Sequence, residues 1–177
     1  RKCDIKKADG LVLPGVGTFE SGLKNLQQKK LIKVIKKVVR EGKPLLGICL
    51  GLQLLFSESE ESPGIKGLNL INGKVKKFNL NQVEKVPHMG WNNLNPVKDL
   101  ELFSGIKKPY NFYFVHSYYV LPEKEETIAA ETKYGNLLFP ALIKKKNIWG
   151  IQPHPEKSSQ KGLQLLNNFA QYCSAKR

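Results

Sequence analysis

Short apolar runs alternate, in the first third of the chain, with a longer stretch in which apolar positions recur at helical spacing. Leu11-Val12-Leu13 precedes Pro14-Gly15-Val16-Gly17, which is typical of a buried strand that ends in a glycine turn. Between Thr18 and Gly42 the apolar residues recur with lysines between them and predict one long helix. Leu45-Leu46-Gly47-Ile48 predicts a second buried strand. A strand, a helix and another buried strand form a βαβ unit, so we expect a parallel sheet covered by helices.

The pattern changes after the second strand. The apolar residues that follow Cys49 predict a new helix that ends at Pro63-Gly64. Residues 68–94 break into short pieces, which predict small antiparallel strands and loops at one edge of the sheet. Three later strands are predicted at Tyr113-Phe114-Val115, Thr127-Ile128-Ala129-Ala130 and Ile148-Trp149-Gly150-Ile151-Gln152. A last helix is predicted from about Ser159 to Cys173.

The composition is typical of one globular domain that spans residues 1–177. The 177 residues are 41% hydrophobic and 25% charged, and no apolar run approaches the ~20 residues that cross a bilayer. We therefore expect no membrane partner. Three widely spaced cysteines argue against a disulfide framework and favour a reducing, cytoplasmic location. With three histidines and no Cys-x-x-Cys pair, no metal site such as a zinc site is expected.

The net charge of +14 raises the question of nucleic-acid binding. The excess is almost all lysine and is scattered along the chain, without the arginine stripe or the repeated aromatic residues that base recognition favours. We therefore expect no nucleic-acid partner. The charge would still attract anionic molecules at low salt.

Cys49 lies between two glycines where the second predicted strand gives way to a helix. A strand, a cramped turn and a helix form the elbow that presents a nucleophile, and side chains at Gly47 or Gly51 would obstruct it. The start of the helix adds positive potential, which we expect to lower the pKa of the thiol. The same geometry would direct the backbone N–H of Leu50 at a developing oxyanion. Cys49 is thus a candidate nucleophile, and the alternative is a buried structural cysteine.

A histidine and a carboxylate follow the last predicted strand, within Pro153-His154-Pro155-Glu156. Loop residues at this point would lie over the end of the sheet. His154 is a candidate general base for a cysteine nucleophile, and Glu156 would hold its imidazole in the working tautomer. The alternative is a structural histidine beside a proline. The remaining histidines and cysteines receive no chemical role: His88, His116, Cys3 and Cys173.

Five segments across nearly the whole chain resemble the class I, triad-type glutamine amidotransferases. They are Leu13-Pro14-Gly15-Val16-Gly17-Thr18-Phe19, Gly47-Ile48-Cys49-Leu50-Gly51-Leu52-Gln53-Leu54-Leu55-Phe56, Val86-Pro87-His88-Met89-Gly90-Trp91-Asn92, Phe114-Val115-His116-Ser117-Tyr118 and His154-Pro155-Glu156-Lys157-Ser158. The resemblance implies an α/β, flavodoxin-like three-layer sandwich, with a mostly parallel central sheet, helices on both faces and a small antiparallel edge sheet. Within the family, the chain is most similar to the glutaminase subunits that supply a cyclase in histidine biosynthesis.

The resemblance implies that Cys49 attacks the side-chain amide of glutamine, while His154 transfers protons with the help of Glu156. Two backbone N–H groups would stabilise the tetrahedral intermediates, that of Leu50 and that of either Val16 or Gly17. The positions implied for glutamine binding are Gln53, Glu61, Ser117 and Tyr118. Since Gln53 and Glu61 are eight residues apart, one helix would place them on similar faces. The alternatives are a solvated carboxylate for Glu61 and a packing role for Tyr118.

A partner protein also follows from the resemblance. The ammonia would pass to a (β/α)8-barrel cyclase subunit in a heterodimer, and no cofactor would be needed. The segment implied to meet this partner is Met89, Gly90, Trp91 and Asn92. A tryptophan that follows a glycine could instead fill the core, although interface anchoring suits it well.

Two departures from the family pattern leave alternatives open. The opening strand, helix and strand of the family are missing before Asp4, so we expect an N-terminally truncated domain without its first βαβ unit. The residue before His154 is Pro153 where the family has an aromatic residue, and proline fixes φ and removes an N–H. The alternatives are a glutaminase that serves another synthase, such as a surface-sugar amidotransferase, and a non-catalytic truncated subunit that only binds a partner.

Overall fold

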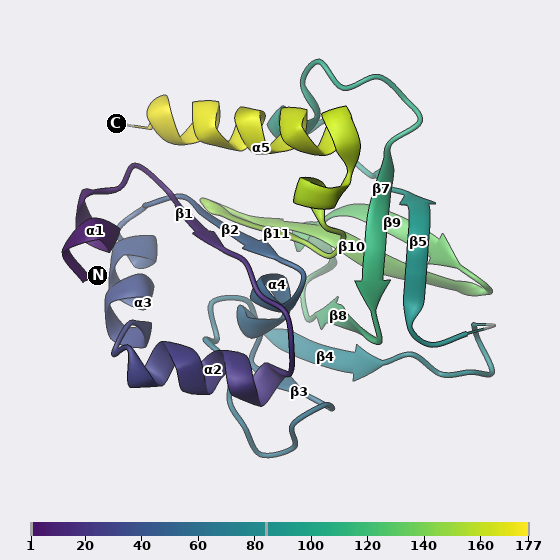
Figure 1. The fold of residues 1–177 in the computed structure, drawn as a ribbon, viewed down its shortest axis with the longest axis horizontal. Helices are drawn as coiled ribbons and strands as arrows, with labels where there is room; N and C mark the ends of the chain where they lie inside the picture. The colour runs from purple at the N-terminus through teal and green to yellow at the C-terminus, as the bar shows by residue number, and fades with distance from the viewer. Residues whose placement is uncertain (1, 84, 177) are drawn as a thin grey trace.

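A central six-stranded sheet separates two layers of helices (Figure 1). A computed structural model describes residues 2–83 and 85–176 of the chain. The strand order is β1-β2-β11-β10-β9-β6. The bounds are Leu11–Leu13 for β1, Leu45–Ile48 for β2, Ile148–Ile151 for β11, Leu137–Lys145 for β10, Ile128–Tyr134 for β9 and Asn95–Pro96 for β6. The neighbours β1, β2 and β11 run parallel, and β10, β9 and β6 continue the sheet in antiparallel pairs.

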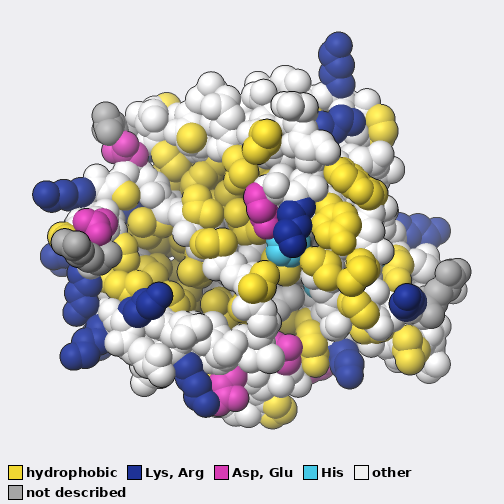
Figure 2. Space-filling model, viewed as in Figure 1, with side chains coloured by type: hydrophobic (Ala, Val, Ile, Leu, Met, Phe, Trp, Pro, Cys, Tyr) yellow, Lys and Arg dark blue, Asp and Glu magenta, His cyan; other side chains and the backbone are white. Residues whose placement is uncertain are grey.

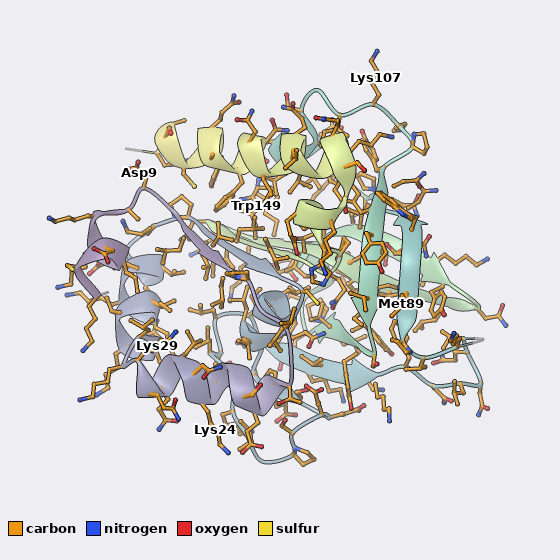
Figure 3. The ribbon with its side chains drawn as sticks, viewed as in Figure 1. Asp9, Lys24, Lys29, Met89, Lys107 and Trp149 are labelled. Carbon is orange, nitrogen blue, oxygen red and sulfur yellow. The ribbon has the colours of Figure 1, made fainter. Side chains whose placement is uncertain are left out.

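Helices cover both faces of this sheet. One face carries α1 (Lys2–Lys7), α2 (Phe19–Gln28), α3 (Ile32–Arg40) and α4 (Leu50–Leu54), and the other carries α5 (Ser159–Ser174). Successive strand residues contribute to opposite sides: Leu45 packs with the helices of the first face, whereas Leu46 packs with α5. Trp149 lies between α5 and the sheet (Figure 3), where its ring meets Tyr172 edge-on. The two hydrophobic cores thus lie on the two faces of one sheet.

Two small sheets flank the central one. One consists of β3 (Glu58–Ser59), β4 (Gly73–Lys77) and β8 (Tyr118–Pro122), and the other pairs β5 (His88–Asn93) with β7 (Asn111–His116) in antiparallel register. Three short 3-10 helices complete the described elements: Glu101–Phe103, Glu125–Thr127 and Pro155–Lys157. The predicted α/β class, with helices on both faces and small antiparallel sheets, is confirmed. None of the described helices is long and apolar enough to cross a membrane.

The single long helix predicted between the first two strands is wrong. The structure has α2 and α3 instead, and Lys30 between them adopts a left-handed conformation with φ of 53°. The cause is visible in the spacing, since Leu31 is five positions after Leu26 and an uninterrupted helix would place the two side chains on different faces.

At the other end of α2, Thr18 and Ser21 form a reciprocal capping box.

The helix predicted from Cys49 to Pro63 is also wrong in its length. The helix α4 ends at Leu54, and Leu55 then accepts backbone hydrogen bonds from Leu70 and Ile71. Phe56 is fully buried. Tertiary contacts of this kind override a helical pattern of apolar residues, so the chain turns back after a short helix.

Candidate active site

Cys49 sits on a sharp turn between β2 and α4, at the carboxyl end of the parallel strands. Its backbone has φ of 52° and ψ of −109°, a combination that residues with a side chain rarely adopt. Its N–H donates a hydrogen bond of 2.8 Å to the carbonyl of Ile151 on β11. Backbone strain of this type is characteristic of functional positions, where the surrounding structure holds a reactive group in place.

The two flanking glycines are required by the space around the turn. A Cβ atom at Gly51 would lie 1.7 Å from the carbonyl oxygen of Leu13 on β1. A Cβ atom at Gly47 would lie 2.8 Å from backbone atoms of Gly51 and Leu52. The sequence-based expectation of a cramped elbow around Cys49 is therefore confirmed.

The expected lowering of the Cys49 pKa is wrong for this geometry. Burial raises the pKa of the thiol to about 11, and it outweighs the opposing effects of the Leu50 backbone N–H and the Gln152 side chain. The helix that follows is only five residues long, so its dipole is small. The thiol is consequently protonated at neutral pH and needs a base to become a nucleophile.

His154 and Glu156 form a close pair directly after β11. Nδ1 of His154 lies 2.7 Å from Oε1 of Glu156, with the imidazole almost fully buried and the carboxylate half exposed. Nε2 of His154 is buried and has no hydrogen-bond partner among the described residues. Because Nδ1 faces a carboxylate, it carries the proton, and Nε2 is left as a free proton acceptor.

Pro153 fits this segment without loss of a hydrogen bond. The N–H of Gln152 donates to Ala141 and the N–H of His154 donates to Tyr113, both at 2.8 Å. The residues on either side of Pro153 thus donate the backbone hydrogen bonds of this segment. The N–H that proline lacks is not needed for any of them. Pro153 therefore does not separate His154 from Glu156.

One cavity of about 300 Å³ brings most of the predicted site residues together. Its lining includes Val16, Gly17, Cys49, Leu50, Gln53, Glu61, Ser117, Tyr118 and His154. This volume is at the small end of the range for ligand pockets, which suits a single amino acid. Glu156 contacts His154 from outside the cavity lining. Three further residues line the cavity that the sequence did not single out for it: Val115, His116 and Lys157.

Gln53 and Glu61 reach the cavity by a route that differs from the prediction. They do not share a helix, because α4 ends at Leu54 and Glu61 lies in a turn after β3. Glu61 instead accepts a hydrogen bond of 2.7 Å from the backbone N–H of Phe19 at the start of α2. Gln53 is buried and donates from Nε2 to the carbonyl of Tyr118 at 3.1 Å. Gln53 and Glu61 therefore line the same cavity, as expected, although they do not lie on the same helix.

The residues proposed as backbone donors, Val16, Gly17 and Leu50, all line the cavity. Val16 is 79% exposed, and Gly17 has φ of 98°, a conformation that favours glycine. Neither backbone N–H donates to another of the described residues. The backbone of Leu50 is close enough to lower the pKa of the Cys49 thiol. These N–H groups are free or directed at sulfur, as anion-binding donors must be.

Gln152 is a site residue that the sequence analysis missed. Its side chain is fully buried, and Nε2 lies 3.7 Å from Sγ of Cys49, within donating distance of sulfur. Its Oε1 faces Nε2 of Gln53 at 3.4 Å. The only signal in the sequence was its position two residues before His154, at the end of a strand that the prediction placed next to the site.

The segment predicted to meet a partner is the exposed strand β5. Met89 and Trp91 are 61% and 55% exposed on one face of the strand, and Trp91 packs edge-on against Tyr113 of β7. Figure 2 shows hydrophobic side chains gathered over β5 and β7, and Figure 3 shows Met89 on the side of the molecule opposite Lys29, the residue that follows α2. Asn92 faces inward, where it donates to the carbonyl of Lys133 and contacts His88. Gly90 has φ of 129°, and no other atom lies within 4 Å of the place that a Cβ would take.

No group of three or more His, Cys, Asp or Glu side chains is placed to hold a metal ion within residues 2–83 and 85–176. The cavity that contains Cys49 is lined by amide, carboxylate, imidazole and ammonium groups. These groups suit a small zwitterionic ligand that has both acidic and basic ends.

Comparisons with known proteins agree with this geometry. The family model for glutamine amidotransferase class-I matches residues 2–172. The chain is 51% identical over 168 residues to an imidazole glycerol phosphate synthase subunit HisH from Moorella thermoacetica, covering 95% of this chain and 79% of the relative. A protein of the same name from Methanocaldococcus jannaschii is 50% identical over 168 residues, covering 95% and 83%. Among solved structures, a glutamine amidotransferase from Thermotoga maritima superposes with a TM-score of 0.60 at 19% identity, covering 94% of this chain and 65% of that one.

Proposed function

The chain belongs to the class-I glutamine amidotransferase family, and from this premise we infer that it is the glutaminase subunit of an imidazole glycerol phosphate synthase. It hydrolyses glutamine to glutamate and ammonia and supplies the ammonia to a cyclase subunit in histidine biosynthesis. Identities near 50% over almost the whole chain to several subunits of that name support this function. The single observation that carries the chemistry is one cavity lined by both Cys49 and His154.

The reaction proceeds in two halves in this proposal. Nε2 of His154 takes the proton from Cys49, and Sγ attacks the side-chain carbonyl carbon of glutamine. His154 then returns the proton to the leaving nitrogen, the C–N bond breaks, and ammonia departs from a thioester. In the second half His154 takes a proton from water, whose oxygen attacks the thioester carbon. The C–S bond breaks, glutamate leaves, and the thiol regains its proton.

The high pKa of the Cys49 thiol makes the base indispensable. At pH 7 a thiol with a pKa of about 11 is almost entirely protonated, so the proton must be removed during attack. Glu156 assists by holding the proton on Nδ1 of His154 and by stabilising the imidazolium that forms. The backbone N–H of Leu50, with that of Val16 or Gly17, stabilises the tetrahedral oxyanions.

Glutamine is held by groups at both ends of the cavity. The carboxylate of Glu61 suits the α-ammonium group of the substrate. Backbone groups of Ser117 and Tyr118 suit its α-carboxylate and α-nitrogen, and Gln53 supports this wall through its hydrogen bond to Tyr118. A polar wall of this kind selects an amino acid over an apolar molecule of the same size.

The cyclase that receives the ammonia docks on the exposed face of β5. We propose a (β/α)8-barrel partner in a heterodimer, with Met89 and Trp91 as anchors, because both side chains are exposed on one face of β5. Residues 1–177 act as one glutaminase domain, to which the family model that spans residues 2–172 lends support. A cytoplasmic location fits the three unpaired cysteines, Cys3, Cys49 and Cys173.

The function is tested by glutamine hydrolysis with and without a purified cyclase subunit. We expect glutamate to form in the presence of the cyclase and its phosphorylated ligand, and no glutamate to form with the Cys49→Ala variant. Ammonia labelled from the amide of glutamine should enter the imidazole product. Hydrolysis that responds to a different synthase but not to the cyclase would overturn the assignment of the partner, and activity in Cys49→Ala would overturn the assignment of the nucleophile.

A further inference from the structure

Two buried histidines that the proposed mechanism does not use face each other across β5 and β7. His88 and His116 are opposite partners in the antiparallel ladder, and they are 3% and 6% exposed. Nδ1 of His88 lies 3.0 Å from Nε2 of His116. Aromatic rings surround the pair: Phe78, Phe114, Tyr134 and Phe139.

The hydrogen-bond partners fix the tautomers of both rings. Nδ1 of His116 lies 2.8 Å from the carbonyl oxygen of Tyr118, and a carbonyl can only accept, so this nitrogen carries the proton. A neutral His116 then accepts at Nε2 from Nδ1–H of His88, and Nε2 of His88 accepts from Nδ2 of Asn92 at 3.2 Å. All four ring nitrogens are thereby satisfied with both rings neutral.

Burial keeps the rings in this neutral state. It lowers the pKa of His88 to about 4 and the pKa of His116 to about 3. The pair therefore carries no positive charge at neutral pH, and the direction of its hydrogen bonds does not reverse.

The carbonyl of Tyr118 connects this pair to the sulfur. It also accepts from Nε2 of Gln53 at 3.1 Å, which fixes the orientation of that amide without any ambiguity between O and N. The same Nε2 faces Oε1 of Gln152, whose Nε2 lies 3.7 Å from Sγ of Cys49. A continuous series of polar groups thus connects His116 to the nucleophile.

We propose that His116, held by His88, is a positioning residue of the glutaminase site: its ring N–H fixes the Tyr118 carbonyl, and through it the Gln53 and Gln152 amides beside Cys49. This inference rests on the proposed glutaminase function. The Tyr118 segment lines the cavity and Gln152 donates to the sulfur, so a displaced carbonyl disturbs both glutamine binding and thiol reactivity. The hydrogen-bonded chain starts at Asn92, on the strand that exposes Met89 and Trp91.

The test compares two substitutions of His116 in the full chain assayed with the cyclase subunit. In His116→Asn the amide N–H occupies the place of Nδ1–H and keeps the bond to Tyr118, whereas His116→Leu loses it. We expect His116→Leu to lower kcat/KM for glutamine about ten-fold, since the Tyr118 carbonyl then loses one of its two donors and can shift to another position. His116→Asn should recover most of this loss. The rate at which iodoacetamide alkylates Cys49 should differ from the wild-type rate in His116→Leu. In His116→Asn it should return to the wild-type rate.

A packing control and a spectroscopic measurement separate positioning from simple structural support. Phe139→Leu removes an aromatic ring that packs against His116 but removes no hydrogen bond. It should therefore lower stability and leave kcat/KM within about two-fold of the wild-type value, a smaller change than the loss expected for His116→Leu. In the wild-type protein, ¹⁵N NMR should show both histidines protonated at Nδ1 only.

Each adverse outcome has a distinct meaning. An active wild type with an unchanged His116→Leu variant, or with His116 protonated at Nε2, overturns the positioning role alone. A wild type that never hydrolyses glutamine in the presence of the cyclase overturns the proposed function itself. If His116→Leu does not fold, the kinetics of His116→Asn and the tautomers in the wild type still decide the question.

Discussion

Glu61 accepts a hydrogen bond of 2.7 Å from the backbone N–H of Phe19, which is 42 residues away in the sequence and begins α2. The same carboxylate lines the cavity beside Cys49. Phe19 follows directly after the loop that contains Val16 and Gly17. One side chain therefore holds the helix that anchors this loop and offers a negative charge to a ligand.

Substitution of Glu61 should separate these two roles. Glu61→Gln keeps an acceptor for Phe19 but removes the charge, so we expect near wild-type stability and a KM for glutamine raised about ten-fold. Glu61→Ala should show the same rise and also lose about 1 kcal/mol of stability, as helix-cap removal does. Urea unfolding and steady-state kinetics measure the two effects. A wild-type KM in Glu61→Gln would show that the charge does not bind substrate.

The backbone of Cys49 predicts an unusual order of stability among its variants. Both Cys49→Ala and Cys49→Gly should be inactive, since the attacking sulfur is gone. With φ of 52°, alanine stays strained at this position while glycine does not, so Cys49→Gly should be more stable than Cys49→Ala by about 1 kcal/mol. Thermal unfolding of the two variants provides the measurement. The reverse order would mean that the turn relaxes once the thiol is removed.

Glu156 should affect turnover more than substrate binding. Glu156→Ala leaves Nδ1 of His154 without its acceptor at 2.7 Å, and we expect kcat to fall about 100-fold with a small change in KM. Glu156→Gln keeps an oxygen acceptor and should retain more activity than Glu156→Ala. Saturation kinetics with the cyclase present tests this. Equal losses in the two variants would argue that charge, and not orientation, is the main contribution.

The buried histidine pair predicts a loss of stability in mild acid. The pKa values of His88 and His116 are about 4 and about 3 in the folded protein, below their ordinary value of 6.5, because burial disfavours the charged rings. Below pH 6.5 the unfolded chain binds more protons than the folded one, so stability is complete above that pH and falls as the pH approaches the folded values. We expect a loss on the order of 2 kcal/mol per histidine by about pH 4.5.

Urea unfolding across this pH range measures the effect. A double variant with His88→Asn and His116→Asn cannot take up these protons, so its stability should depend less on pH in the same window. A wild type and a double variant with the same pH dependence would contradict the neutral, buried state of the pair.

Trp91 should matter for the partner and not for basal hydrolysis. It is 55% exposed on β5, so Trp91→Ala should leave the folded chain intact and weaken cyclase binding by about 2 kcal/mol or more, roughly 30-fold. Leu163→Ala on α5 removes a side chain of similar exposure, 54%, from another surface and serves as the matched control. Isothermal titration with the cyclase subunit measures both. Equal affinities for the two variants would exclude β5 as the docking face.

The elements around the nucleophile could be predicted from the sequence because their signals are local. The strand Leu45–Ile48 and the glycines that flank Cys49 are adjacent along the chain, and a buried strand followed by a cramped turn has few alternatives. The α5 helix was also predictable from its apolar spacing. The segment Leu137–Lys145 was not, although it is the strand β10 within the central sheet, since its apolar run does not alternate and Pro140 within it argues against a strand.

The errors arose where distant contacts decide the structure. The helix after Cys49 is cut short at Leu54 because Leu55 bonds to Leu70 and Ile71, and nothing near Leu55 in the sequence announces this. The pKa of Cys49 was misjudged for the same reason, since its burial depends on strands that arrive later in the chain. Gln152 acts on the sulfur across 103 positions, a relationship that only the folded sheet creates.

The close approach of Gly51 to the carbonyl of Leu13 constrains how this protein can evolve. Any heavier residue at position 51 would push β1 away from the nucleophile turn, and with it the loop that starts at Pro14. Gly42 and Gly64 have no neighbouring atom within 4 Å of an added Cβ, so only their positive φ disfavours a side chain there, whereas at Gly51 the backbone of β1 already occupies the place of a Cβ. A randomised library selected for histidine prototrophy should return glycine alone at that codon.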